Sequence, residues 1–196
     1  MYKNAFVFIM EWLWRLIYLN VVWILFSLPI ITFIPSTFAM FSVANKWFTE
    51  DEDIAIFRTF KKDFSDNFLK SYRYGLPLLL FGFFIYIDLK ILLTLEEPFF
   101  MFVRYVIMII IILYVIILMF TIPIFLNYRF PLFKTYFFAL MLGLKQPIVS
   151  LLVLIGIFLT VGIFLFFTGI GIFFIGSLPV FMICKAVHNA IRKITM

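Results

Sequence analysis

Two pairs of ionisable side chains interrupt apolar stretches of this chain and are its first candidates for chemistry. Glu11 and Arg15 are four residues apart, so on a helix they share one face and can form an ion pair. Asp88 and Lys90 interrupt a second apolar stretch. An ionisable residue inside a membrane span is a candidate for ion or proton movement. We favour the alternative that the first pair reaches water at the outer membrane surface and the second marks an early helix end.

The sequence offers little else that could catalyse a reaction. It has one cysteine, Cys184, and one histidine, His188, which excludes an intramolecular disulfide and the common multi-Cys and multi-His metal sites. The acidic run at 50–53 is explained by stabilisation of a helix N-terminus. No Gly-rich phosphate loop, zinc-protease helix or Ser-His-Asp set is present. We therefore expect no enzymatic activity and no catalytic, cofactor-binding or metal-binding residues.

The elements that carry these residues are predicted to be membrane helices. Hydrophobic residues make up 66% of the 196 residues and charged residues 13%, about half the charged fraction of soluble proteins. The stretch from Gln146 to Cys184 contains no Asp, Glu, Lys, Arg or His, and it is long enough for two spans of about 20 residues. The sequence predicts an all-α polytopic membrane helix bundle, with 1–196 as a single integral membrane domain. About five spans are expected, at residues 10–35, 75–95, 105–127, 147–168 and 171–187.

The distribution of positive charge predicts how the spans are oriented. Twelve of the sixteen Lys and Arg residues fall in the 36–74 loop, the 128–146 segment and the C-terminus. Because basic residues concentrate on the cytoplasmic side, we expect a bacterial inner-membrane protein with an external N-terminus and a cytoplasmic C-terminus. Trp12 then lies at the outer interface and Trp47 at the inner one. The same bias explains the net charge of +6, and no nucleic-acid partner is expected.

The predicted cytoplasmic loop, 36–74, is the only sizeable polar region and contains a predicted amphipathic helix. Phenylalanines recur there at spacings of three and four, with basic residues mostly between them. The apolar face consists of Phe57, Phe60, Phe64 and Phe68. Such a helix can lie in the headgroup plane of a bilayer, or its Phe face can pack on the protein's own spans. The sequence leaves both alternatives open.

A proline preceded two residues earlier by Ser or Thr occurs three times, at Pro29, Pro123 and Pro179. A proline inside a helix removes a hydrogen bond and clashes with the preceding turn, so each is expected to kink its span. All three fall near the predicted cytoplasmic ends of their spans. The recurrence is compatible with a parallel internal repeat or with coincidence, because prolines are common in membrane helices.

The segment 27–39 resembles the signature of the YesL family of bacterial membrane proteins, in which a Leu-Pro-x-x-Thr-x-x-Pro-x-x-x-Ala pattern ends the first span. The matching residues are Pro29, Thr32, Pro35 and Ala39. A later family feature, a proline before a basic residue and a short helix, is similar to Pro123, Arg129 and Ala139. The resemblance implies an inner-membrane protein of five or six spans that is associated with carbohydrate uptake systems of the binding-cassette type. It provides no family catalytic residue that could be assigned to a position in this sequence.

Two functions are compatible with these features. The first is a non-enzymatic accessory or interaction protein that supports a transporter, suggested by the amphipathic segment and the lack of catalytic groups. The alternative is a small transporter or channel subunit, suggested by the proline-containing spans. The expected partners are the lipid bilayer and a transporter complex or other membrane protein, and no cofactor is expected. The sequence leaves the oligomeric state open.

Overall fold

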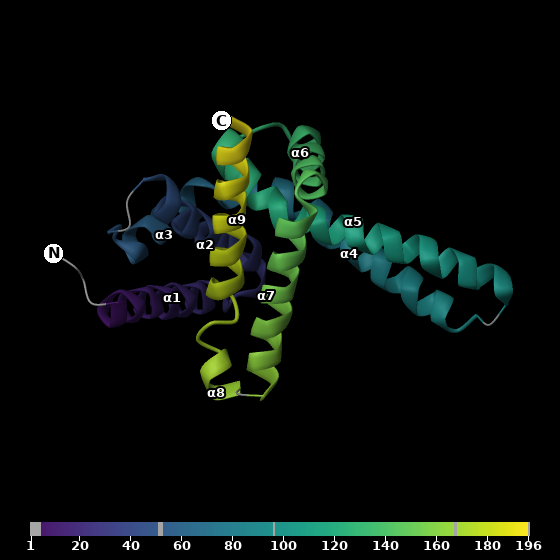
Figure 1. Ribbon diagram of the computed structural model, residues 1–196, viewed down its shortest axis with the longest axis horizontal. Helices are drawn as coiled ribbons and strands as arrows, with labels where there is room; N and C mark the ends of the chain where they lie inside the picture. Colours follow the sequence, from purple (N-terminus) through teal and green to yellow (C-terminus); the bar gives the residue numbers. More distant parts are fainter. Residues whose placement is uncertain (1–4, 51–52, 96, 167, 196) are drawn as a thin grey trace.

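The computed structural model describes residues 5–50, 53–95, 97–166 and 168–195, and every regular element in these ranges is helical. The elements are α1 (Ala5–Ser27), the 3-10 turn η1 (Ile30–Thr32), α2 (Phe33–Thr49), α3 (Ile56–Asp66), α4 (Phe68–Leu93), α5 (Pro98–Tyr128), α6 (Leu132–Lys145), α7 (Pro147–Phe166), α8 (Thr168–Gly171) and α9 (Ser177–Thr195). The α4–α5 hairpin projects away from the remaining helices (Figure 1). The predicted all-α helix bundle is confirmed.

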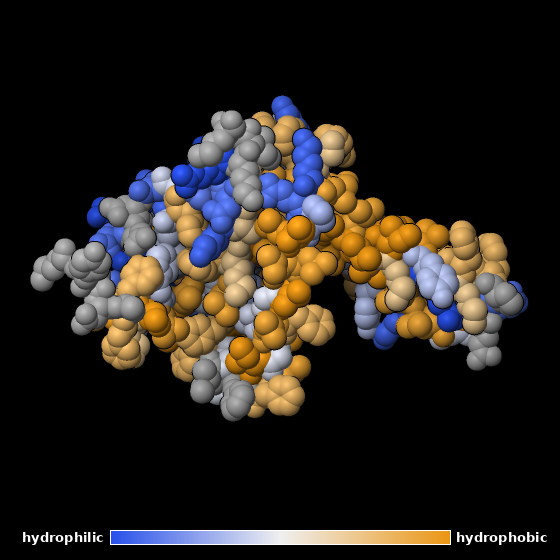
Figure 2. Space-filling view, in the orientation of Figure 1, coloured by the Kyte–Doolittle hydropathy of each residue, from blue (hydrophilic) through white to orange (hydrophobic). Residues whose placement is uncertain are grey.

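Four of the described helices, α1, α4, α5 and α7, are long and apolar enough to cross a membrane. In α4 the only buried residues are Ser71, Tyr74 and Leu92. Figure 2 shows a largely hydrophobic surface on the α4–α5 hairpin, with hydrophilic residues at its tip, over α3 and over the C-terminal part of α9. A long apolar helix that leaves its side chains uncovered is stable in hydrocarbon, so these helices identify a membrane protein.

The predicted fifth span, residues 171–187, differs from the structure. The helix in this region, α9, begins at Ser177 and carries Lys185 near its middle and Arg192 near its end. These charges keep α9 outside the set of helices apolar enough to cross a membrane, so the described residues contain four candidate spans. The predicted span 147–168 matches α7 closely, whereas α4 and α5 begin seven residues before the predicted spans 75–95 and 105–127.

The predicted first span, residues 10–35, is not one continuous helix. α1 ends at Ser27, and Pro29 has an extended backbone (φ −73°, ψ 119°). Proline has no N–H to continue the helix and disfavours helical geometry in the residue before it. The hydroxyl oxygen of Thr32 lies 2.6 Å from the carbonyl oxygen of Phe26 and 2.7 Å from that of Pro29. It therefore serves the carbonyl group of Phe26, which the end of α1 leaves without a helical partner.

After this break, α2 runs back along α1. The indole N–H of Trp23 donates to the hydroxyl oxygen of Thr37 (3.2 Å), and the Trp12 and Trp47 rings meet at 5.5 Å between centroids. Most residues of α2 are buried. The first part of the predicted 36–74 loop is therefore a core helix, and α3 supplies its amphipathic part.

The reversal also corrects the predicted topology. Trp12 and Trp47, which were expected at opposite membrane interfaces, are in contact. Arg15, expected on the outer side, forms an ion pair with Asp53, which belongs to the segment expected in the cytoplasm. The prediction that these residues lie on opposite sides of the membrane is wrong, because the turn at Pro29 returns the chain to the start of α1.

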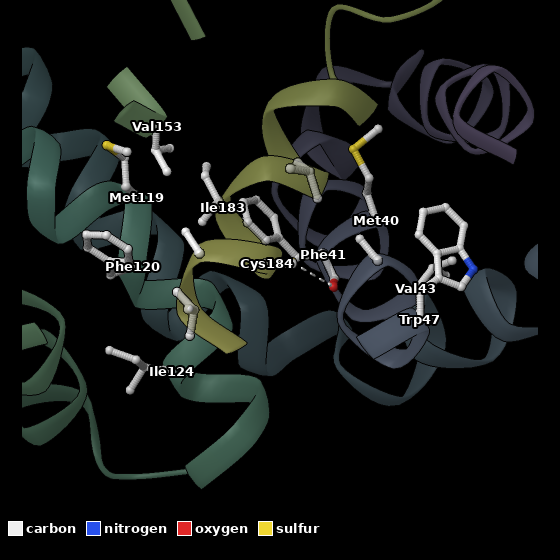
Figure 3. Packing of buried hydrophobic residues seen from close by; sticks show 14 of the residues in the cluster. Met40, Phe41, Val43, Trp47, Met119, Phe120, Ile124, Val153, Ile183 and Cys184 are labelled. Carbon is white, nitrogen blue, oxygen red and sulfur yellow. Dashed lines mark hydrogen bonds between the residues drawn. The ribbon is translucent and has the colours of Figure 1, made fainter. Parts of the chain in front are cut away.

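The hydrophobic core forms where α2, α5, α7 and α9 meet (Figure 3). Phe41, Phe120, Val153 and Ile183 contribute one buried side chain from each of these helices. Cys184 is fully buried beside them, with its sulfur 3.8 Å from the carbonyl oxygen of Phe41. Burial raises the pKa of the Cys184 thiol, so the side chain is protonated and unreactive near neutral pH.

A buried amide joins α1 to α9. Asn20 is fully buried, and its Oδ1 accepts hydrogen bonds from the backbone N–H groups of Gly176 and Ser177, each at 3.0 Å. Its Nδ2 donates to the carbonyl oxygen of Ile172 at 2.7 Å. The first N–H groups of a helix have no partner within the helix, and here a side chain from α1 caps α9.

Candidate polar binding pocket

The C-terminal turns of α2, α3 and α5 enclose a polar pocket of about 380 Å³, called here the α2–α3–α5 pocket. This volume falls within the range of small-molecule sites, about 300–1,000 Å³. The lining combines hydroxyl, amide, carboxylate and cationic groups, among them Ser42, Asn45, Lys46, Asp63, Asn127 and Arg129. All these groups can donate or accept hydrogen bonds, so the pocket suits a polar ligand.

Asp63 of α3 is the centre of a buried polar network. Its side chain is held among α2 residues, and the residue as a whole is only 8% exposed. One carboxylate oxygen accepts hydrogen bonds from the Ser42 hydroxyl (2.8 Å) and the Lys46 ammonium (2.9 Å), and the other lies 3.2 Å from the same ammonium. A buried carboxylate needs such partners because its desolvation costs several kcal/mol. The network therefore fixes α3 against α2.

A reciprocal amide pair forms a second wall of the pocket. Asn45 Nδ2 donates to Asn127 Oδ1 at 3.2 Å, and Asn127 Nδ2 lies 3.3 Å from Asn45 Oδ1. Asn127 Nδ2 also donates to the carbonyl oxygen of Pro123 at 2.8 Å. Pro123 is buried within α5, which continues through it. The pair joins α2 to α5, and Asn45 keeps a second amide N–H that no described residue accepts.

Arg129 lies at the pocket edge in an unusual backbone conformation. With φ at 49°, it is the only non-glycine residue with positive φ in the described ranges. Its N–H donates to the carbonyl oxygen of Phe125 at 2.9 Å, which ends α5 before the chain turns into α6. The left-handed conformation costs a non-glycine residue about 1 kcal/mol, and such strain concentrates at functional sites. The exposed Arg129 side chain brings a positive charge to the pocket.

The residues of the 27–39 motif build the helix reversal and do not line the pocket. Pro29 and Thr32 form the break after α1. Pro35 and Ala39 are buried in the first half of α2, and the proline occupies its first turn, where no N–H is needed. Pro179 occupies the equivalent first turn of α9. The motif therefore positions α2, whose last turns reach the pocket.

The predicted Phe face of α3 packs largely on the protein itself. Phe60 is fully buried, and the rings of Phe57, Phe60 and Phe64 lie 6.2, 5.1 and 5.2 Å from the ring of Phe26 in α1. Phe68 begins α4 and contacts Phe64 at 5.4 Å. Phe57 keeps 47% of its surface exposed. Of the two alternatives that the sequence left open, packing on the protein's own helices accounts for Phe60 and Phe64.

The ionisable pairs found in the sequence lie outside the pocket. Asp88 and Lys90 are exposed near the C-terminal end of α4. Glu11 and Arg15 are partly buried in α1, where Arg15 pairs with Asp53. Within the described ranges, no three His, Cys, Asp or Glu side chains are placed to hold a metal ion.

Sequence reasoning missed most of the pocket, although a signal was present. Asp63 lies between Phe60 and Phe64 on the buried side of α3, a position that demands a partner for the carboxylate. Asn20 and Asn45 likewise stand inside apolar runs, and polar residues in such runs mark buried contacts or sites. Which of these side chains meet could not be predicted before the reversal at Pro29 was known.

Residues 16–89 match the family model described as "Protein of unknown function, DUF624". The chain is 28% identical over 185 residues to the uncharacterized protein YesL of Bacillus subtilis (strain 168), covering 93% of this chain and 87% of YesL. It is 28% identical over 190 residues to the uncharacterized protein YteU of the same organism, covering 94% of this chain and 84% of YteU. No solved structure matches the chain. The family-matched region runs from α1 into α4 and includes Lys46 and Asp63.

Proposed function

We propose that this chain, a YesL-like membrane protein from a family of unknown function, is a non-enzymatic accessory protein that binds a small polar ligand in the α2–α3–α5 pocket. The observation that carries the proposal is a pocket of about 380 Å³ lined by polar groups from three helices. Polar groups inside a membrane protein are expensive to bury and are placed where they bind or transmit something. Ligand binding here would be coupled to the relative positions of α2, α3 and α5.

The lining favours a ligand with many hydroxyl groups. The amides of Asn45 and Asn127 both donate and accept hydrogen bonds, and Arg129 adds a cation at the edge. Sugars and sugar acids present matching donors, acceptors and, for the acids, a negative charge. The resemblance to YesL-like proteins implies a link to carbohydrate uptake, so we propose sugars as the first ligand class.

We also propose that the protein has no catalytic activity of its own. In the pocket, the carboxylate of Asp63 and the ammonium of Lys46 are bound to each other. A general base or nucleophile must be available to the substrate. The pair therefore supports a structural role for both groups, and the remaining pocket residues supply binding interactions.

The proposed contact with a partner is the α4–α5 hairpin. Many of its apolar side chains are exposed, including Phe83 and Phe84 on α4. Phe60 and Phe64 are unsuitable for this role because they pack on α1. We propose that helices of a transporter complex contact this hairpin. Loss of co-purification after Phe83→Ala and Phe84→Ala, with the protein still folded, would support the proposal.

The decisive experiment measures ligand binding by thermal unfolding of the detergent-purified protein with a panel of mono- and disaccharides and sugar acids. A ligand of the pocket should raise the unfolding temperature of the wild type. Arg129→Gln should weaken the response at least ten-fold, because its exposed side chain contributes to the pocket and to no described ion pair. Arg73→Gln, which removes an exposed charge outside the pocket, serves as the matched control. If no member of the panel stabilises the wild type, the sugar proposal is abandoned.

The side of the membrane on which the pocket opens is a separate proposal. We propose the cytoplasmic side, because the pocket and its surroundings carry Lys46, Lys62 and Arg129. A cysteine at the exposed position Ser65 should react with a membrane-impermeant maleimide only after the cells are opened. The wild type is a suitable background because Cys184 is buried and its raised pKa disfavours the thiolate. Labelling of intact cells would reverse this orientation.

The alternative function is a small transporter or channel subunit. It is favoured by the interrupted pair α1–α2, because broken helices build the solute sites of many transporters. This alternative predicts solute flux in proteoliposomes that contain the purified protein alone. The accessory proposal predicts binding without flux, so one preparation can separate the two functions.

A further inference from the structure

The outer face of α3 combines positive charge with an exposed aromatic side chain. Arg58 and Lys61 are three residues apart, and Lys61 is four residues from Phe57, so all three share one side of the helix. Each is exposed, and together they line a shallow hollow of about 360 Å³. Figure 2 shows hydrophilic residues gathered in this part of the surface. The composition is that of a surface that meets anionic lipid.

Among the described residues, no carboxylate pairs with the basic side chains on this face. Two neighbouring carboxylates have partners of their own, in the ion pairs Asp53–Arg15 and Asp63–Lys46, and the carboxylate of Asp66 borders the α2–α3–α5 pocket. Arg58 and Lys61 form no ion pair with any described residue. The first turn of α3 contains no acidic residue, so the positive end of the helix dipole adds to the potential there. An anion near Arg58 and Lys61 would be attracted by both side chains and by the positive N-terminal end of α3.

The turn between α1 and α2 places apolar side chains beside this face. The ring of Phe57 packs 6.2 Å from that of Phe26, near the end of α1. The following turn exposes Leu28, Ile30 and Ile31, and Ile30 retains 91% of its accessible surface. Such a turn is costly in water and favourable among lipid acyl chains just below the headgroups.

We infer that Arg58, Lys61 and Phe57 form a binding site for the headgroup of an anionic phospholipid, with the turn at 28–31 inserted among the acyl chains. The adjoining apolar turn and the membrane-spanning helices identify the anion as lipid rather than as a soluble phosphate. A basic residue near an anionic membrane strengthens binding about five-fold, so the two cations together contribute about thirty-fold. The site does not depend on the ligand proposed for the α2–α3–α5 pocket.

The test follows thermal unfolding of the protein in a neutral detergent with increasing phosphatidylglycerol, phosphatidylcholine or glycerol phosphate. We expect phosphatidylglycerol alone to raise the unfolding temperature. The double variant Arg58→Gln, Lys61→Gln should unfold at the wild-type temperature without lipid, because both side chains are exposed and unpaired among the described residues. Its half-maximal response should require about thirty-fold more phosphatidylglycerol. Lys62 is left unchanged because it also borders the polar pocket.

Matched variants distinguish a specific lipid-binding site from nonspecific electrostatic attraction of anionic lipid to the protein. Lys145→Gln with Lys185→Gln removes the same charge from two other exposed positions and should keep the wild-type lipid response. Phe57→Ser should weaken the response while leaving the charge intact. An equal loss in the Lys145 and Lys185 control would overturn the inference. So would an unchanged response in the Arg58 and Lys61 variant, or equal stabilisation by phosphatidylcholine or glycerol phosphate.

Discussion

α2 and α4 are neighbouring helices, but the apolar helix α4 is mostly exposed, whereas α2, which carries several polar residues, is mostly buried. α4 is apolar enough to cross a membrane, yet Ser71, Tyr74 and Leu92 are its only buried residues. α2 carries Ser42, Asn45 and other polar residues and is buried along most of its length. In a protein solvated by hydrocarbon, apolar side chains gain little from leaving the lipid, so burial follows polar contacts and close helix approach. Hydropathy therefore predicts which helices are surrounded by lipid, but it does not predict which residues form the protein core.

A matched pair of phenylalanines tests this comparison with the largest expected effect. Phe60 is fully buried beside α1, whereas Phe84 on α4 is 62% exposed. Phe60→Ala should lower the free energy of unfolding by about 3–5 kcal/mol, because it removes a buried ring and leaves a cavity. Phe84→Ala should change it by less than about 1 kcal/mol. Both values can be measured by denaturant titration in mixed micelles, and equal losses would break the comparison.

Part of this contrast could be predicted from the sequence. The charge-free runs give α7 and the C-terminal end of α5 to within two residues, because hydrocarbon demands long apolar helices, although α5 begins seven residues before the predicted span. The amphipathic period of α3 and its Phe face could also be found from spacing alone. The burial of α2 could not be predicted, because residues 36–45 were expected to begin the 36–74 loop and their packing depends on the reversal at Pro29.

The three Ser/Thr-x-Pro stretches show why the reversal was hidden. Pro29 separates two helices, Pro123 lies inside the continuous α5, and Pro179 occupies the first turn of α9. The local chemistry of a proline is the same in each case: it removes one N–H and disfavours the preceding helical residue. The outcome depends on the surroundings, such as the Thr32 hydroxyl that serves the freed carbonyl of Phe26. Nothing within the short pattern distinguishes these surroundings.

An intermediate effect is expected where a polar side chain holds the packed region together. Asn20→Ala removes the cap from the N–H groups of Gly176 and Ser177 and leaves them buried without a partner. We expect a loss of about 2–3 kcal/mol in the free energy of unfolding and faster amide exchange at the start of α9. Asn189→Ala, at an exposed position on the same helix, should change neither quantity. Unchanged amide exchange at the start of α9 in the Asn20 variant would show that the cap is dispensable. It would also contradict the conclusion that buried polar contacts hold the core together.

The smallest expected effect lies where α4 meets α2, and its sign is informative. A Cβ atom at Gly75 would approach Cγ2 of Ile34 to 2.6 Å, whereas a Cβ atom at Gly162 in α7 would meet nothing within 4 Å. Gly75→Ala should therefore destabilise by about 1 kcal/mol, because the strain of about 1–3 kcal/mol exceeds the gain in helix propensity. Gly162→Ala should stabilise by up to about 1 kcal/mol. If the two substitutions change the free energy of unfolding in opposite directions in mixed micelles, the first turns of α4 belong to the packed region and α7 near Gly162 does not. Stabilisation by both substitutions would instead mean that α4 is free of α2 along its whole length.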